Sequence, residues 1–177
     1  MKLDKITSDA SCTTNAVTPV MSVMSENPGI KKAVLNTVHA YTASQKIVDG
    51  PDKNDVRRAR AAAQNKVPST TGAALVATKA FPSLEGKIDG VSLRVPVICG
   101  SIMDFTFIAA RSTSAEEINS IFKKAAAEKQ WQGILAVTEE PLVSSDIVRN
   151  SHGSIVDLAM TKVVDGDLVK ILSWYDN

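Results

Sequence analysis

The chain has 177 residues, of which 44% are hydrophobic and 22% are charged, and its formal net charge is +1. This length suits one globular domain with a real core. The near balance of acidic and basic residues excludes the basic surface typical of nucleic-acid binding, and no apolar run approaches the ~20 residues that a membrane span needs. The N-terminus has no apolar signal region, and two cysteines are too few for a disulfide framework. We therefore expect a soluble domain in the cytoplasm that binds neither nucleic acid nor membrane.

The first predicted element is a helix over residues 13–26, because apolar side chains recur there at helical spacing. Its apolar positions are Val17, Val20, Met21 and Met24. A strand is predicted over 33–41, with His39 on the face opposite Val38. The polar stretch 42–68 follows, and loops of this length inside a domain are usually functional.

The second half of the chain predicts strands, helices and one hairpin. Asp165 and Gly166 lie between two apolar segments and predict a β-hairpin with a two-residue turn. This order of elements favours an α+β fold, with a mixed, largely antiparallel sheet and helices covering one face. The other predicted elements are a helix over 72–80, strands over 90–95 and 102–110, a helix over 115–129 and a strand over 134–138.

Cys12 is the first candidate for chemistry, because it follows Ser11 where a helix is predicted to begin. Unpaired N–H groups and the positive end of the helix dipole lower the pKa of a thiol at such a position and favour the reactive thiolate. The alternative is a small buried apolar side chain, a common role of cysteine. Cys99 lacks that setting, and we expect it to be structural.

His39 is the candidate base for this thiol, in the Cys–His pairing that activates many sulfur nucleophiles. A lone histidine on a strand is more often a hydrogen-bonded structural residue, so this role depends on whether the fold brings His39 to Cys12. His152 has no comparable partner in the sequence, and we interpret it as structural or exposed.

Cationic and helix-start residues indicate anion binding. Thr71 and Gly72 open a predicted helix whose free N–H groups suit an anion, while Arg58 and Arg94 offer forked donors for phosphate oxygens. Arg94 interrupts an apolar strand, so it needs either a carboxylate partner, with Asp104 as the candidate, or an anionic ligand. Exposure to solvent explains Arg58 equally well, and a simple helix cap explains Thr71 equally well. These residues predict a thiol enzyme with anion sites and leave its reaction open.

Several longer motifs resemble the glyceraldehyde-3-phosphate dehydrogenase family, and the resemblance extends over residues 8–177. The erythrose-4-phosphate dehydrogenases usually lack two of these motifs, which favours the three-carbon substrate. The motifs are residues 10–15 (ASCTTN), 37–45 (TVHAYTASQ), 49–51 (DGP), 57–63 (RRARAAA), 68–74 (PSTTGAA), 94–96 (RVP) and 173–177 (SWYDN).

The resemblance implies a role for each matching residue. Cys12 matches the family's nucleophile, and His39 matches the residue that activates the thiol and assists proton transfer. Thr42 and Arg94 match the site for the phosphate of the substrate. Asn177 matches the residue that binds the nicotinamide carboxamide, and no metal ligands are implied. The residues that match the site of the attacking phosphate are Ser11, Thr13, Arg58, Thr71 and Gly72.

The implied reaction is the oxidation of glyceraldehyde 3-phosphate to 1,3-bisphosphoglycerate, with NAD and inorganic phosphate, through a thiohemiacetal and a thioester on cysteine. The family works as a homo-oligomer, a tetramer. Its dinucleotide-binding domain and its final helix have no counterpart in residues 1–177, and Gly-x-Gly-x-x-Gly does not occur among the nine glycines. We therefore expect a single catalytic domain, from a split or truncated gene or an excised piece, that is inactive as a dehydrogenase without the domain that holds most of the NAD. A cofactor-independent thiol hydrolase and a non-catalytic assembly module are the alternatives.

Two positions and one segment depart from the family pattern. Asp9 stands where the family usually has Asn, and it is expected to weaken phosphate binding or to raise the pKa of Cys12. Ala16 replaces a second, non-nucleophilic cysteine at little expected cost. The segment 97–101 differs from the Thr-Pro-rich segment common after Arg-Val-Pro, which alters the neighbourhood of Arg94.

Overall fold

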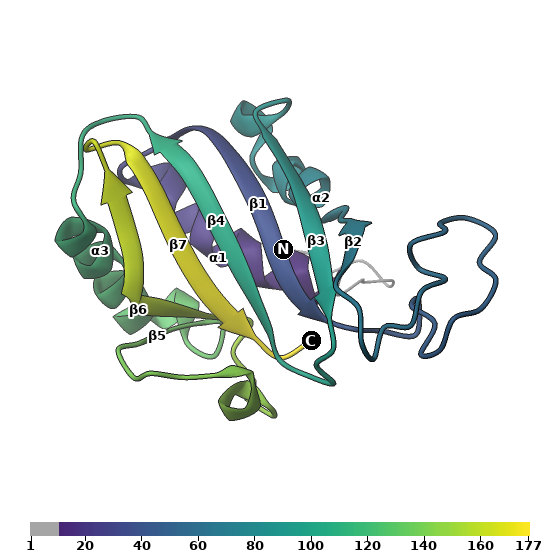
Figure 1. The fold of residues 1–177 in the computed structure, drawn as a ribbon. Coiled ribbons are helices and arrows are strands. Elements are labelled where there is room, and N and C mark those ends of the chain that lie inside the picture. Colours follow the sequence, from purple (N-terminus) through teal and green to yellow (C-terminus); the bar gives the residue numbers. More distant parts are fainter. Residues whose placement is uncertain (1–10) are drawn as a thin grey trace, which may run out of the picture.

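One mixed sheet organises the molecule: the computed structural model describes residues 11–177, and their strands form a single seven-stranded sheet (Figure 1). The strands are β1 (Ile30–Ala40), β2 (Val67–Thr70), β3 (Ile88–Val95), β4 (Ser101–Ala109), β5 (Leu135–Thr138), β6 (Ser154–Val164) and β7 (Leu168–Tyr175). Their order across the sheet is β2-β3-β1-β4-β7-β6-β5. The pairs β1–β3 and β5–β6 are parallel, and the other neighbouring pairs are antiparallel. The predicted mixed, largely antiparallel sheet is therefore confirmed.

The helices cover one face of this sheet, as predicted, and leave the other face open (Figure 1). The first, α1, contacts β1, β4, β6 and β7, while α2 lies on β3 and α3 on β5 and β6. The helices are α1 (Cys12–Glu26), α2 (Ala73–Ala80) and α3 (Ala115–Ala127), with short 3₁₀ turns η1 (Pro82–Leu84), η2 (Lys129–Trp131) and η3 (Ser144–Ile147).

The apolar side of α1 is the one that its sequence predicts. All four apolar positions are fully buried against the sheet, and the helix begins one residue earlier than expected. Ala16, the position where the family has a second cysteine, is also fully buried in this core. The four apolar positions predicted for α1 are Val17, Val20, Met21 and Met24.

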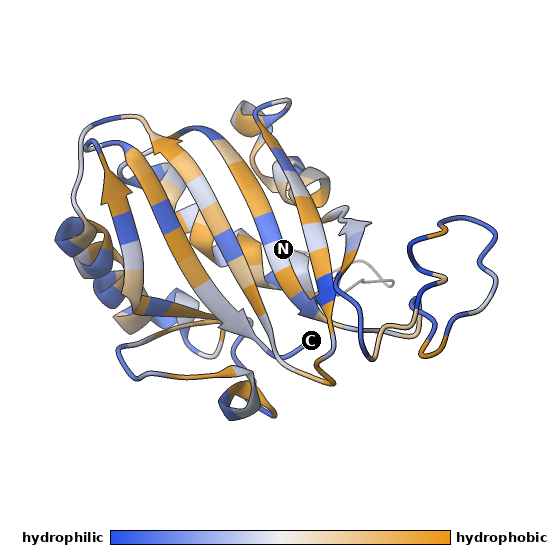
Figure 2. Cartoon of the chain, in the orientation of Figure 1, coloured by the Kyte–Doolittle hydropathy of each residue, from blue (hydrophilic) through white to orange (hydrophobic). Residues whose placement is uncertain are grey.

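Strand β1 shows how the sheet separates its two faces. Leu35, Thr37 and His39 are buried on the side of the helices, whereas Val34 is 60% exposed on the open face. Successive side chains of a strand point to opposite faces, and Figure 2 shows the resulting alternation of polar and apolar residues along the central strands. His39 therefore lies on the covered face, under the helices.

The register of the strands gathers distant residues at one end of the sheet. Strand β1 runs parallel to β3, which sets His39 beside Arg94. Strand β4 runs antiparallel to β7, which sets Ser101 beside Tyr175. The carboxyl ends of β1, β3 and β7 consequently meet at the same end of the sheet, where α1 also begins.

The predicted hairpin joins β6 to β7 and has a longer turn than expected. Val164 pairs with Leu168, so the turn has three residues, of which Asp165 (φ 49°) and Gly166 (φ 75°) are left-handed. The turn also bonds to the end of β4, because the Asp167 carbonyl accepts from the Ala109 N–H at 2.8 Å. The three-residue turn is thus bonded to the neighbouring strand.

The polar stretch after β1 forms an extended loop that projects from the sheet (Figure 1). It folds back on itself, since the N–H of Lys46 donates to the carbonyl of Arg58 and that of Gly50 to the carbonyl of Ala59. None of the helices within residues 11–177 is long and apolar enough to cross a membrane.

Candidate active site

The site is built around the first residue of α1. Ser11 is the N-cap in an extended conformation, and its hydroxyl accepts a hydrogen bond from the Thr14 N–H at 3.1 Å. This is the usual cap that begins a helix, and it leaves Cys12 at the first helical position. The half-buried thiol therefore lies at the positive end of the helix dipole.

His39 faces this thiol from the end of β1. Its Nε2 lies 3.4 Å from Cys12 Sγ, and its ring is only 2% exposed. The fold therefore brings together the two residues that the sequence identified as candidate nucleophile and base.

The other nitrogen of the ring decides which proton state His39 holds. Nδ1 lies 2.6 Å from the Ala40 carbonyl oxygen and 2.6 Å from Arg94 Nη1. With its single proton position, Nδ1 cannot donate to the Ala40 oxygen and accept from Arg94 Nη1 at the same time. With the proton on Nδ1, the ring donates to the Ala40 oxygen, which Arg94 Nη1 also reaches at 3.2 Å; with the proton on Nε2, Nδ1 accepts from Arg94. The first of these tautomers leaves Nε2 bare toward the thiol.

Burial also keeps the His39 ring neutral. Desolvation lowers the pKa of His39 from 6.5 to about 4; the hydrogen bond to Ala40 opposes this shift and the charge of Arg94 adds to it. An imidazole with this pKa carries no charge near pH 7. The ring is therefore in the neutral form that a base requires.

Tyr175 supports both members of the pair, and sequence reasoning missed it. Its hydroxyl lies 2.9 Å from Thr13 Oγ1, and its ring meets the His39 ring edge-on with centroids 5.9 Å apart. Burial raises the pKa of the Tyr175 hydroxyl above its ordinary value, so the phenol stays protonated. The signal available in the sequence was an aromatic residue at the end of an apolar strand.

A first cavity of about 490 Å³ opens on one side of Cys12. Arg94 lies in its wall, and burial lowers the pKa of this guanidinium from its high ordinary value, although arginine remains charged. The residues that line it are Ser11, Cys12, Thr13, Thr14, His39, Thr70, Thr71, Gly72, Ala73, Val76 and Arg94.

Arg58 stands near this first cavity without lining it. Its Nη2 donates to Ser69 Oγ at 3.3 Å, and its Nε lies 3.5 Å from Asp55. Its charge is close enough to Arg94 to lower the pKa of that residue. Two neighbouring guanidinium groups repel each other unless an anion lies between them, so this arrangement suits a phosphate.

The helix start at α2 adds backbone donors to the first cavity. Gly72 is its N-cap, and Thr71 Oγ1 accepts from the Ala73 N–H at 3.2 Å. Thr42 does not line the cavity; its hydroxyl contacts Ser44 and donates to Gln45 Oε1. Of the candidate phosphate-site residues, Thr42 and Arg58 are thus the two that the structure places outside the cavity wall.

Asp104 was the predicted carboxylate partner of Arg94, and the structure shows that this prediction is wrong. Asp104 forms an ion pair with Lys170 and accepts from Thr106. The register pairs Asp104 with Asn36, three positions before His39, so Asp104 projects from the open face while Arg94 lies on the covered face.

A second cavity of about 540 Å³ lies on the other side of the same thiol. Asn177, the candidate cofactor-binding residue, is in its wall, and Asn177 Oδ1 accepts from Ser101 Oγ at 2.7 Å. His152 also lines this cavity, half-buried and with its Nδ1 2.9 Å from Asn150 Oδ1. The lining residues are Ser11, Cys12, Asn15, Asn150, Ser151, His152, Gly153, Asp176 and Asn177.

Cys99 has a different partner from Cys12. Its thiol donates to Asp176 Oδ1 at 2.9 Å, and this bond raises the pKa of Cys99, helped by burial and by the charge of Asp176. Cys99 is thereby held as a neutral thiol.

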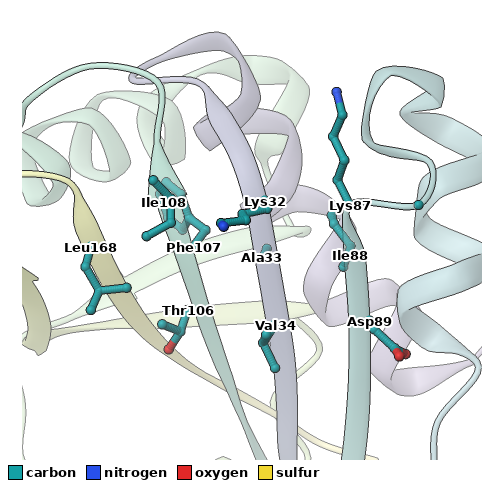
Figure 3. Close-up of a pocket in the computed structure, with 11 residues that line it drawn as sticks. Lys32, Ala33, Val34, Lys87, Ile88, Asp89, Thr106, Phe107, Ile108 and Leu168 are labelled. Atoms are coloured by element: carbon teal, nitrogen blue, oxygen red, sulfur yellow. The ribbon is translucent and has the colours of Figure 1, made fainter.

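A further hollow, of about 370 Å³, lies away from this chemistry among β1, β3 and β4 (Figure 3). Its wall includes Val34, Phe107 and Leu168 together with Lys32 and Asp89, and it contains no cysteine or histidine. Across the part of the chain that the structure describes, no three His, Cys, Asp or Glu side chains are grouped so as to hold a metal ion. Asp9, whose effect the sequence raised, lies outside the described residues.

Comparison with known proteins agrees with this fold. The family model described as "Glyceraldehyde 3-phosphate dehydrogenase, C-terminal domain" matches residues 11–177. The chain is 52% identical over 172 residues to glyceraldehyde-3-phosphate dehydrogenase 2 of Streptomyces avermitilis, covering 97% of the chain and 51% of that protein. It is 46% identical over 174 residues to the glyceraldehyde-3-phosphate dehydrogenase of Zymomonas mobilis, covering 98% and 51%.

Fold and relatives together define an oxidoreductase domain of the dehydrogenase class. The chain belongs to the glyceraldehyde-3-phosphate dehydrogenase family, as its C-terminal, catalytic domain. It spans about half the length of the curated relatives it matches.

Proposed function

We propose that this domain supplies the nucleophile and the anion sites of an enzyme that oxidises glyceraldehyde 3-phosphate to 1,3-bisphosphoglycerate. The observation that carries the proposal is the Cys12–His39 contact of 3.4 Å in a cavity that also holds Arg94. A thiol beside a bare imidazole nitrogen suits attack on an aldehyde, and the arginine suits a substrate that carries phosphate.

In the first step Cys12 Sγ bonds to the aldehyde carbon as its proton passes to His39 Nε2. The imidazolium returns this proton to the carbonyl oxygen, which gives the thiohemiacetal and restores neutral His39. In the oxidation the carbon loses a hydride while the hydroxyl proton passes to His39, and the product is a thioester on Cys12. Because burial lowers the pKa of His39 to about 4, the imidazole is neutral near pH 7 before each transfer.

The thioester is then resolved by inorganic phosphate. A phosphate oxygen attacks the acyl carbon, the bond from carbon to Cys12 breaks, the Cys12 sulfur takes the proton held by His39, and the acyl phosphate leaves. Arg58 and Arg94 with the helix starts at Ser11 and Gly72 supply donors for this anion and for the phosphate of the substrate. Two arginines and two helix starts around one thiol suit two anions held together.

The cofactor proposed for the oxidation is NAD, which accepts the hydride when bound. The amide groups around the second cavity suit its nicotinamide end: with Oδ1 bound to Ser101, Asn177 keeps Nδ2 as a donor for a carboxamide oxygen. The rest of the dinucleotide has no glycine fingerprint to bind in this sequence. We assign it to a dinucleotide-binding domain, which this chain would need for turnover, in a cytoplasmic homo-oligomer.

The acylation half of the reaction needs no cofactor, so it tests the proposal on this chain directly. Incubation with 1,3-bisphosphoglycerate should add one 3-phosphoglyceroyl group to Cys12, seen by intact-mass and peptide mass spectrometry. Cys12→Ser should abolish the adduct, and the matched variant Cys99→Ser should keep it. Added inorganic phosphate should discharge the acyl group faster than buffer does.

The same measurement separates the alternatives. Discharge by water as fast as by phosphate would support a thiol hydrolase instead. A folded chain that forms no adduct on Cys12 would refute the catalytic assignment and leave the assembly module.

A further inference from the structure

The carboxylate of Asp176 joins three segments of the chain beside the second cavity. Its Oδ1 accepts from the Cys99 thiol at 2.9 Å, and its Oδ2 accepts from the Arg149 backbone N–H at 2.7 Å. Hydrogen bonds to an ionised acceptor are stronger than those between neutral groups. Both oxygens of Asp176 are thus held, one by each of two loops.

The backbone of these two loops is fixed near the donors. Gly100, next to Cys99, has φ +88°, and a Cβ there would lie 2.4 Å from the Ser144 carbonyl oxygen. Arg149 is one of the two non-glycine residues in the described part of the chain with positive φ, at 70°. Such conformations persist only where the surrounding structure determines them.

What Asp176 holds is the wall of the second cavity. Arg149 directly precedes residues 150–153, which line that cavity, and Asn177 follows Asp176. Asn177 is itself bound to Ser101, two residues after Cys99. The contacts of Asp176 thus connect the two sides of the wall, the loop at 150–153 and the end of β7.

We propose that Asp176 is a positioning residue: held by the Cys99 thiol and the Arg149 N–H, it fixes Asn177 and residues 150–153 around the second cavity. Cys99 then has a specific structural role, as the side-chain donor of this junction. The consequence for nicotinamide binding rests on the function proposed above.

The test compares Cys99→Ala, which removes the donor, with Cys99→Ser, which keeps a hydroxyl donor at the same place. In the 177-residue chain without ligand, the ¹⁵N-detected side-chain amide of Asn177 should shift and broaden in Cys99→Ala and stay close to wild type in Cys99→Ser. Titration with nicotinamide riboside should show affinity about threefold to tenfold weaker in Cys99→Ala, the usual net effect of losing one hydrogen bond. The alkylation rate of Cys12 should not change.

A second variant guards against misfolding of the first. In Asp176→Asn, rotation of the amide places an N–H group toward one of the two donors, so the signals of residues 150–153 or of Asn177 should shift. Asn177 signals unchanged in folded Cys99→Ala, or equally perturbed in Cys99→Ala and Cys99→Ser, would overturn the proposal. Asn177 signals that shift as expected while even wild type binds no nicotinamide riboside would support the positioning role and reject the cofactor assignment instead.

Discussion

Cys12 and Cys99 are both half-buried thiols, and each has one hydrogen-bonding side chain. Cys12 lies at a helix start and faces a neutral imidazole that can take its proton. Cys99 faces the carboxylate of Asp176, which holds the proton on sulfur and raises the pKa of Cys99. The difference shows that the partner of a thiol, more than its exposure, sets its chemistry.

The largest expected effect comes from removing the partner of Cys12. In His39→Asn, acylation of Cys12 by 1,3-bisphosphoglycerate should slow by about 10²- to 10⁴-fold, the usual contribution of a positioned acid–base group. Quenched-flow mass spectrometry gives the rate. The rate at which iodoacetamide alkylates Cys99 in the same variant is the internal reference. It should equal the wild-type rate. Acylation at an unchanged rate would remove His39 from the mechanism.

A smaller effect is expected when the two thiols compete for one reagent. With iodoacetamide at pH 7, Cys12 should be labelled at least about tenfold faster than Cys99, because only the thiolate reacts. Peptide mass spectrometry resolves the two sites. Asp176→Asn should speed the labelling of Cys99 and leave that of Cys12 unchanged. Equal labelling of both thiols in wild type would contradict the contrast drawn between them.

The smallest effect concerns stability in acid. The folded-state pKa of His39 is about 4, against 6.5 ordinarily, so the unfolded chain binds the extra proton between these values. The stability that the neutral ring confers is therefore present above pH 6.5 and is lost as the pH falls toward 4, at no more than about 1.4 kcal/mol per pH unit. Urea unfolding across this range should show a shallower loss in His39→Gln. Parallel curves for the two proteins would count against a buried neutral His39.

Elements with strong local signals were predictable from the sequence. Helix α1 carries its apolar face at helical spacing and a Ser11 cap, and the hairpin carries Asp165 and Gly166, which accept left-handed backbone. Strand β2 was missed because it has four residues and contains Pro68, which argues against a strand. The first part of β6 was missed because the register shifts between Asp157 and Lys162, which breaks the alternation.

Candidate site residues could be identified from the sequence where one motif contains them, and their partners could not be predicted where strand pairing decides them. Cys12 and His39 stand in motifs of their own. The Asp104 partner of Arg94 was wrong because the face to which a strand residue points depends on the register with its neighbours. The contacts of Asp176 with Cys99 and Arg149 likewise join loops far apart in the sequence, so no local pattern indicates them.

The bond between Tyr175 and Thr13 joins residues 162 positions apart, the end of the last strand to the start of the first helix. During translation, Cys12 and His39 are synthesised early, whereas β7 is synthesised after every other strand of this sheet. Until β7 pairs with β4, the His39 ring lacks the aromatic neighbour that packs against it, and Thr13 lacks its hydroxyl partner. Contacts of this sequence separation form late, so the thiol gains its final surroundings only when this domain is fully synthesised.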